Sequence, residues 1–167
     1  LYGTNNFKNI TFKVENNDTE VLYIYVKEWP IFESFEITGL NNVKSSKDDT
    51  ENINKINEMV DYGRGDFVTD NRTFKITQKI KNFLINEGYY YAQVNSSLIK
   101  TSDKKNRVKL MLDIFEGPEI KVKFVEYYSR EKLGKLKKIY LKYKASVDKG
   151  DVFKMPEFEN DINKLKV

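Results

Sequence analysis

The chain has 167 residues, of which 40% are hydrophobic and 14% aromatic, enough to build packed cores and to argue against disorder. Lys and Arg number 29 against 25 Asp and Glu, a mild excess that does not by itself indicate a nucleic-acid partner. There is no His and no Cys, so the commonest transition-metal ligands and the usual nucleophile–base pairs are missing. We therefore expect no cofactor and no metal, and an enzyme is the least supported class of function.

No segment is long enough to be a membrane-spanning helix. The longest continuous apolar run, Val21 to Val26, is far shorter than the ~20 residues that cross a bilayer. The chain begins at Leu1 without a Met, and we expect it to be an interior piece of a longer protein.

The first ~30 residues contain two segments in which apolar and polar residues alternate. Such alternation predicts two half-buried strands. Pro30 follows the second segment and ends its ladder, because proline has no N–H to donate. The inward residues are expected to be Ile10, Phe12 and Val14 in the first strand, and Leu22, Ile24 and Val26 in the second.

The middle of the chain predicts a complete α+β unit in the order β-α-α-β-β. Its first strand covers about 32–38, with Phe35 and Ile37 inward, and ends at Gly39. A helix over about 51–60 follows a Thr50 cap, and a Gly-containing turn at 63–65 leads to a second helix over about 71–87. Strands over about 89–99 and 107–115 form a hairpin around the polar loop 100–106. The apolar helix faces are Ile53, Ile56 and Val60 in the first, and Ile76, Ile80, Phe83 and Leu84 in the second.

The stretch from Ile120 predicts the start of another such unit. Val122 and Phe124 mark its first strand, and Pro156 suits the first turn of its second helix. Its expected helix faces are Leu133, Leu136, Tyr140 and Tyr143, then Phe158, Ile162 and Leu165.

An internal repeat supports this division. The segments from Leu22 to Pro30 and from Leu110 to Pro118 both read apolar-x-apolar-x-apolar-x-Glu-x-Pro. Leu1 to Phe7 resembles Leu84 to Tyr90 more weakly, with Asn5 and Gly88 at the left-handed position that ends a helix. The sequence thus predicts the end of one unit at 1–29, a complete unit at 30–118 and the truncated start of a third at 119–167.

Tandem β-α-α-β-β units separated by proline resemble the polypeptide-transport-associated (POTRA) repeats of BamA-type outer-membrane protein assembly factors. The residues that carry the resemblance are Leu1 to Ile10, Val26-Lys-Glu-Trp-Pro30, Phe35-Glu-Ile-Thr-Gly39, Leu84 to Tyr91 and Arg107 to Leu112. The chain departs from the family in having Asn5 where Gly is usual, and a long polar stretch from Asn41 to Asn54.

The resemblance implies a three-stranded mixed sheet packed on two helices, and a location at the periplasmic face of a Gram-negative outer membrane. It implies three partners: unfolded outer-membrane β-barrel proteins, accessory lipoproteins, and the protein's own C-terminal membrane barrel outside this chain. We expect no nucleic-acid partner.

The predicted strand over about 89–99 is the candidate binding site. If the last strand of the unit lies in the middle of the sheet, this strand is an edge with unpaired main-chain groups. This strand carries no charged side chain, so the charges that commonly prevent an edge strand from pairing with another chain are missing. An extended peptide could therefore add to it by β-augmentation. Its inward residues are predicted to be Tyr90, Ala92, Val94 and Leu98, and its outward residues Tyr91, Gln93, Asn95 and Ser97. The candidate peptide-binding residues of this edge strand are Tyr89, Tyr91, Gln93, Asn95 and Ser97. The alternative is an edge that is merely solvated or covered by a neighbouring unit.

The junctions of the units, Trp29-Pro30 and Gly117-Pro118, are predicted inter-module hinges. Two other functions stay open. One is the POTRA region of a two-partner secretion exporter or a division protein. The other is a nucleic-acid-binding module that uses the basic segment from Arg130 to Lys144, although a solvated lysine face opposite a packed apolar stripe is the simpler interpretation.

Overall fold

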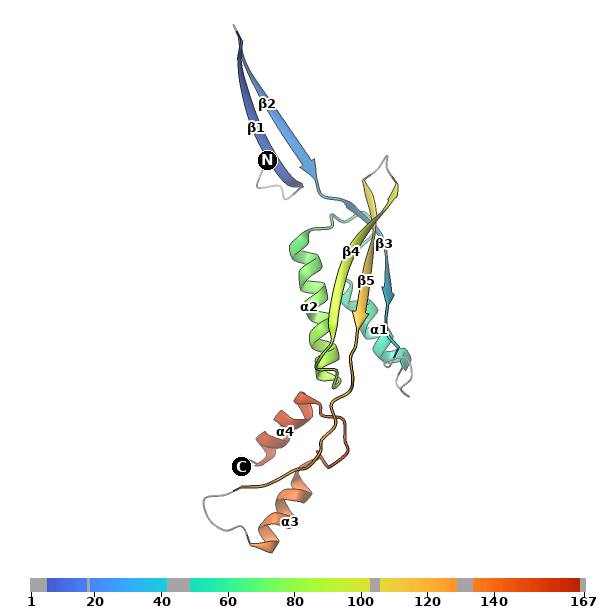
Figure 1. Ribbon diagram of the computed structural model, residues 1–167, viewed down its shortest axis with the longest axis vertical. Coiled ribbons are helices and arrows are strands. Elements are labelled where there is room, and N and C mark those ends of the chain that lie inside the picture. Colours follow the sequence, from blue (N-terminus) through green and yellow to red (C-terminus); the bar gives the residue numbers. More distant parts are fainter. Residues whose placement is uncertain (1–5, 18, 42–48, 103–105, 129–133, 166–167) are drawn as a thin grey trace.

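The computed structural model describes residues 6–17, 19–41, 49–102, 106–128 and 134–165. The chain is elongated, with a β-hairpin at one end, a sheet backed by helices in the middle, and a pair of helices at the other end (Figure 1). The elements are β1 (Phe7–Asn17), β2 (Thr19–Glu28), β3 (Ile31–Thr38), α1 (Asp49–Met59), α2 (Asp70–Asn86), β4 (Gln93–Ser102), β5 (Arg107–Phe115), α3 (Lys135–Lys144) and α4 (Met155–Leu165).

The middle part is a three-stranded mixed sheet in the order β3-β5-β4. β5 is central, parallel to β3 and antiparallel to β4, which confirms the predicted α+β class and the inner place of the last strand. Residues of α1, α2 and β5 share one core, so both helices cover the same face of the sheet. The fully buried side chains at its centre are Ile56, Val68, Ile76, Ile80, Leu84, Leu110 and Leu112.

Capping residues define the ends of α2, whereas two predicted element starts need correction. Thr69 caps α2, its side chain accepting from the N–H of Arg72 at 3.3 Å, and Gly88 follows the helix with φ +99° as predicted. The expected Thr50 cap is wrong, because α1 already begins at Asp49 and Thr50 lies in its first turn. The predicted strand from Tyr89 is shortened, because Tyr90 and Tyr91 form a turn and β4 begins only at Gln93.

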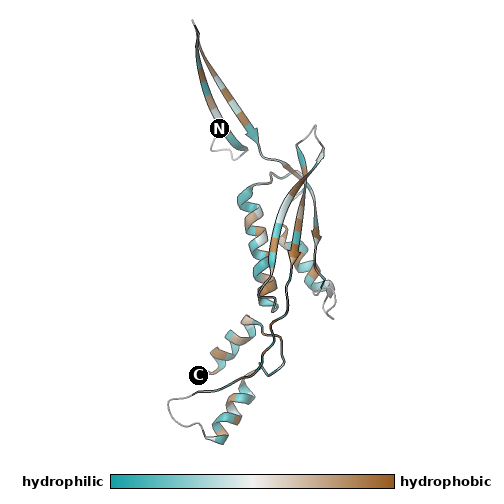
Figure 2. Cartoon of the chain, viewed as in Figure 1, coloured by the Kyte–Doolittle hydropathy of each residue, from teal (hydrophilic) through white to brown (hydrophobic). Residues whose placement is uncertain are grey.

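The N-terminal hairpin β1–β2 has the predicted alternation but not the predicted burial. Phe12, Val14, Leu22, Ile24 and Val26 are all 47–59% exposed, and only Ile10 is buried. Apolar and polar positions alternate along both strands in Figure 2. Alternation specifies which residues share a face, but no described helix covers this one. Asn5, the expected helix end, lies outside the described residues.

The C-terminal part repeats the loop geometry of the middle unit. The N–H groups of Gly65 and Gly150 donate to the carbonyls of Phe32 and Val122, at 2.9 and 2.8 Å. In return, the N–H groups of Phe32 and Val122 donate to the carbonyls of Asp66 and Asp151. Each aspartate side chain also closes its own turn, accepting from the N–H of Gly63 or Asp148. These paired Gly-Asp turns hold the first extended segment of a unit against the loop before its second helix.

Two expectations for this part need correction. Residues 119–128 form no strand, only the isolated bridge Lys121–Val152, because a strand needs a partner along its length. Leu136, Tyr140 and Tyr143 of α3 do share a face, yet they are 58–84% exposed instead of packed. Leu133 lies outside the described residues. Pro156 does stand in the first turn of α4, as predicted.

Candidate strand-binding site

The site is the outer side of β4. Along Gln93–Ser102 one side of β4 pairs with β5, and no other strand of the described chain pairs with the opposite side. β3 is the other edge of the sheet, but the Gly-Asp turn covers its beginning, where the N–H of Val68 donates to the carbonyl of Pro30 at 2.8 Å. β4 is therefore the longer open edge of this sheet.

The register with β5 assigns the side chains of β4 to two faces. Val94, Ser96 and Leu98 lie opposite the buried residues Ile114, Leu112 and Leu110, which places them on the helix face. The outer-face residues are Gln93, Asn95, Ser97 and Ile99. No charged residue stands between Gln93 and Ile99, so the charges that commonly protect an edge are absent from this stretch.

A groove of about 430 Å³ runs between β4 and α2, beside the open edge. Phe74 and Leu98 are its exposed apolar side chains, at 62% and 42% exposure. The Thr77 hydroxyl is buried in its floor and donates to the Phe74 carbonyl at 2.9 Å. The groove is lined by Asp70, Thr73, Phe74, Thr77, Val94, Asn95, Ser96, Ser97 and Leu98. It combines apolar surface with hydroxyl groups, a lining that accepts side chains of varied size and polarity.

The end of the groove touches the preceding hairpin. Lys8 of β1 forms an ion pair with Asp70 at 3.0 Å, and the same ammonium lies 4.9 Å from the centre of the Trp29 ring. Trp29 is half-buried, and its carbonyl accepts from the Asn106 amide at 3.2 Å. The predicted hinge at Trp29-Pro30 is thus placed next to the groove, held by exposed or half-buried contacts.

The second predicted hinge, Gly117-Pro118, lies beside a closely packed joint. Lys154 forms an ion pair with Glu87 at 2.8 Å, and Tyr90 stacks on Phe153 with ring centres 5.7 Å apart. The Ile120 N–H donates to the Gly88 carbonyl at 3.1 Å. These contacts join the end of α2 to the segment before α4.

Of the five candidate binding residues, Gln93, Asn95 and Ser97 lie on the outer face of β4. Tyr91 is exposed but belongs to the turn before β4. Tyr89 is 4% exposed and belongs to the core, where its hydroxyl donates to Glu119 at 3.3 Å. Burial, reinforced by the charge of Glu119, raises the pKa of Tyr89 to about 12.

The groove residues Phe74 and Thr77 were missed. Phe74 falls outside the apolar stripe of α2 that predicts the core. An aromatic residue off that stripe was the signal available in the sequence, and only the structure places it next to β4. In the described ranges no group of three or more acidic side chains is arranged to hold a metal ion. None of the helices described there has the length and apolar character of a bilayer span.

A three-stranded mixed sheet packed on two helices, with a proline before its first strand and another after its last, defines a small α+β module. A sequence model of the POTRA family, described as surface antigen variable number repeat, matches residues 30–117. That match covers more than half of the chain, and the chain belongs to the POTRA family.

A solved structure agrees on the fold. The crystal structure of Haemophilus influenzae BamA POTRA3-5 superposes with a TM-score of 0.54 at 18% identity, covering 97% of this chain and 63% of that one. The N-terminal domain of Omp85 from the cyanobacterium Thermosynechococcus elongatus gives 0.48 at 14% identity, covering 99% of this chain and 66% of the other. No curated protein sequence matches this chain significantly. The chain spans less than two thirds of the BamA fragment that it resembles.

Proposed function

We propose that this chain is part of the periplasmic scaffold of an outer-membrane β-barrel assembly factor, and that unfolded outer-membrane proteins bind to it as added β-strands. The observation that carries the proposal is the outer side of β4, which pairs with no strand among the described residues. This side is uncharged from Gln93 to Ile99 and is flanked by the groove against α2. Membership of the POTRA family supports the scaffold role.

Strand addition at β4 explains how one site serves many sequences. The affinity comes from main-chain hydrogen bonds, which every peptide can make, and the alternating side chains adjust it. Side chains of the added strand that point toward α2 enter the groove between Phe74 and Leu98. Those that point the other way meet the polar face formed by Asn95 and Ser97. An amphipathic strand of a membrane barrel has this alternation of apolar and polar side chains.

The same proposal includes the division of the chain into units, their partners and their location. The units are 1–29, 30–118 and 119–167, and Trp29-Pro30 and Gly117-Pro118 are the hinges between them. Accessory lipoproteins dock on the array, which lies at the periplasmic face of the outer membrane next to the protein's own barrel. The BamA name of the similar structure supports this setting. The alternative within the family is a two-partner secretion exporter or a division protein, and the sequence after Val167 distinguishes them.

An amide-shift titration of the ¹⁵N-labelled chain with an amphipathic barrel-strand peptide tests the site. We expect shifts along Gln93–Ser102 and at Phe74 and Thr77. Ser96→Lys places a charge on the groove side of the edge and should weaken binding. Ser34→Lys, at an exposed position of β3 on the opposite edge, is the matched control and should not. Shifts that are absent, or confined to α1 and α3, would contradict the proposal.

A further inference from the structure

A single residue, Trp29, joins the hairpin β1–β2 to the middle unit. Its N–H donates to the carbonyl of Asn6, just before β1, at 3.5 Å. Its carbonyl accepts from the side-chain amide of Asn106, in the middle unit, at 3.2 Å. Pro30 already belongs to the middle unit, because its carbonyl accepts from the N–H of Val68 at 2.8 Å. The backbone torsions of Trp29 are therefore the pivot between the two parts, and the following proline restricts them to the extended region.

Lys8 of the hairpin spans this pivot. The register of β1 with β2 shifts between Phe7 and Asn9, which makes Lys8 the extra residue of a β-bulge, a distortion that re-aims side chains. Its ammonium lies 4.9 Å from the centre of the Trp29 ring and donates to both carboxylate oxygens of Asp70, at 3.0 and 3.2 Å. One cation of the hairpin thus contacts both the pivot residue and the first turn of α2.

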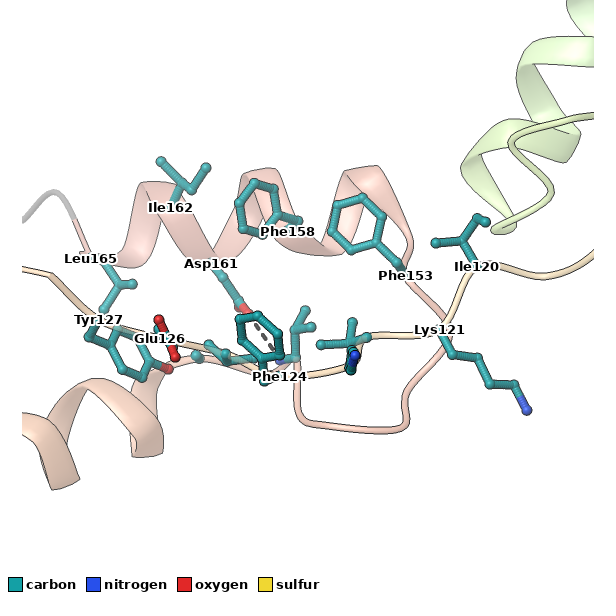
Figure 3. A pocket seen from close by; sticks show the side chains of 15 residues that line it. Ile120, Lys121, Phe124, Glu126, Tyr127, Phe153, Phe158, Asp161, Ile162 and Leu165 are labelled. Carbon is teal, nitrogen blue, oxygen red and sulfur yellow. Dashed lines mark hydrogen bonds between the residues drawn. The ribbon is translucent and has the colours of Figure 1, made fainter.

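The junction after β5 is closed in a different way. The connecting segment is anchored through Ile120, whose N–H donates to the Gly88 carbonyl at 3.1 Å and whose carbonyl accepts from the Phe153 N–H at 2.7 Å. Tyr90 stacks on Phe153, and Figure 3 shows Phe153 beside Ile120 at one end of the pocket that α4 borders. Backbone bonds and stacked rings close this junction, whereas the ammonium of a side chain closes the first.

The contacts of Lys8 are weak enough to open. The side chains of Lys8 and Asp70 are 39% and 74% exposed. An exposed ion pair or an exposed cation–π contact changes an equilibrium constant by up to about fivefold. Salt weakens the ion pair further, because the Debye length falls to roughly 3 Å at 1 M. Together the two contacts favour one orientation of the hairpin without fixing it.

Asp70 also belongs to the groove beside β4. Among the described residues that line this groove, Asp70 is the charged one, and it lies at the end where the groove meets the hairpin. A strand added to β4 with a Lys or Arg side chain toward this end presents a second cation to the same carboxylate. The binding site and the contact across the pivot therefore share one residue.

We propose that Lys8 is a latch across the pivot at Trp29, and that a basic side chain of a strand added to β4 opens this latch by competing for Asp70. The opening step rests on the proposed function, whereas the latch itself does not. Because coupling between two equilibria is reciprocal, the closed latch weakens the binding of such a strand by the factor with which the strand opens the latch.

Distance measurements across the pivot test the latch. The chain has no Cys, so spin labels at Thr11→Cys in β1 and Asn82→Cys in α2, both exposed positions, report only on this distance. By double electron–electron resonance we expect a narrow distance distribution with Lys8 present and a broad one in Lys8→Gln. Lys13→Gln is the matched control, because Lys13 pairs with Glu15 inside the hairpin. Its distribution should stay narrow.

Salt and two further variants complete this test. About 1 M NaCl should broaden the distribution of the chain that keeps Lys8 and leave that of Lys8→Gln unchanged. Asp70→Asn should behave like Lys8→Gln, and Lys8→Arg should stay narrow because it keeps the charge. Unchanged amide shifts of residues 30–117 in each variant show that the middle unit is folded. Equal widths with and without Lys8, or equal broadening in Lys13→Gln, would overturn the latch.

Two strand peptides test the opening step. Both have a central Leu for the groove, and they carry either Lys or Gln at the two positions two residues away, so that either strand direction brings one of these side chains to Asp70. The Lys peptide should broaden the distance distribution and bind Lys8→Gln up to about fivefold more tightly, and the Gln peptide should do neither. Equal broadening by both peptides would overturn competition for Asp70.

The same titration separates this inference from the proposed function. Amide shifts along Gln93–Ser102 without any change in the distance distribution would overturn the opening step and leave the strand-binding site intact. Absence of those shifts would overturn the proposed function and the opening step together. The comparison of Lys8→Gln with Lys13→Gln, at low and high salt, decides the latch in either case.

Discussion

Two glycines in nearly the same backbone conformation allow the joint after α2 to be tested by itself. Gly65 has φ +101° and Gly88 has φ +99°, in the region that side chains with a Cβ adopt at a cost. A Cβ at Gly65 meets no atom within 4 Å, whereas a Cβ at Gly88 would lie 2.3 Å from a methyl group of Val152. Gly65→Ala and Gly88→Ala therefore share the backbone penalty and differ in one contact.

The magnitudes follow from that difference. The backbone penalty is about 1–2 kcal/mol for either alanine, so Gly65→Ala should lower the free energy of unfolding by that amount. Gly88→Ala should add about 1–3 kcal/mol for overpacking against Val152, unless the joint opens to relieve the clash. Opening would separate Phe153 from Tyr90 and Lys154 from Glu87, contacts that now hold the joint closed.

Urea denaturation of both variants, together with their amide spectra, measures the two outcomes. We expect Gly88→Ala either to be less stable than Gly65→Ala or to show shifted amides at Val152 and Phe153. Adding Val152→Ala to Gly88→Ala should remove its additional destabilisation relative to Gly65→Ala, because it deletes the methyl group that the new Cβ meets. Equal stability of the two variants, with unshifted amides at the joint, would refute the packing described for Gly88.

Three further predictions concern stability. Leu110→Ala, in the fully buried centre of β5, should lower the free energy of unfolding by about 2–5 kcal/mol in chemical denaturation. Leu22→Ala, at the equivalent exposed position of β2, should lower it by under about 1 kcal/mol, and equal losses would contradict the assigned burial. Thr69→Ala removes the cap of α2 and should cost about 0.5–2 kcal/mol, with Thr69→Ser as the control that keeps the hydroxyl. Burial acts to raise the pKa of Asp161, but hydrogen bonds from Ser146 outweigh it and hold that pKa below the usual range. The stabilising contribution of Asp161 to the free energy of unfolding is therefore present above the unfolded-state pKa, and it is lost as the pH falls below about 4 through the folded-state pKa. The amide shift of Ser146 should follow this loss in the wild type but not in Asp161→Asn.

The sequence by itself determined the order of elements in the middle unit and the apolar faces of α2 and β5. Alternation in 107–115 and the helical spacing of Ile76, Ile80 and Leu84 are local patterns, and each identifies one apolar face whatever lies against it. Gly88 was predictable for the same reason, because a left-handed residue after a helix is a local backbone requirement.

Only the tertiary structure decided what covers each face and which edges stay open. The same alternation buries Leu110 and exposes Leu22, because burial depends on elements distant in sequence. Residues 119–128 have strand-like composition but form no strand, since main-chain pairing needs a partner that sequence periodicity cannot supply. The groove beside β4 likewise required the position of α2 against the sheet, which places Phe74 next to Leu98 although no local pattern connects the two residues.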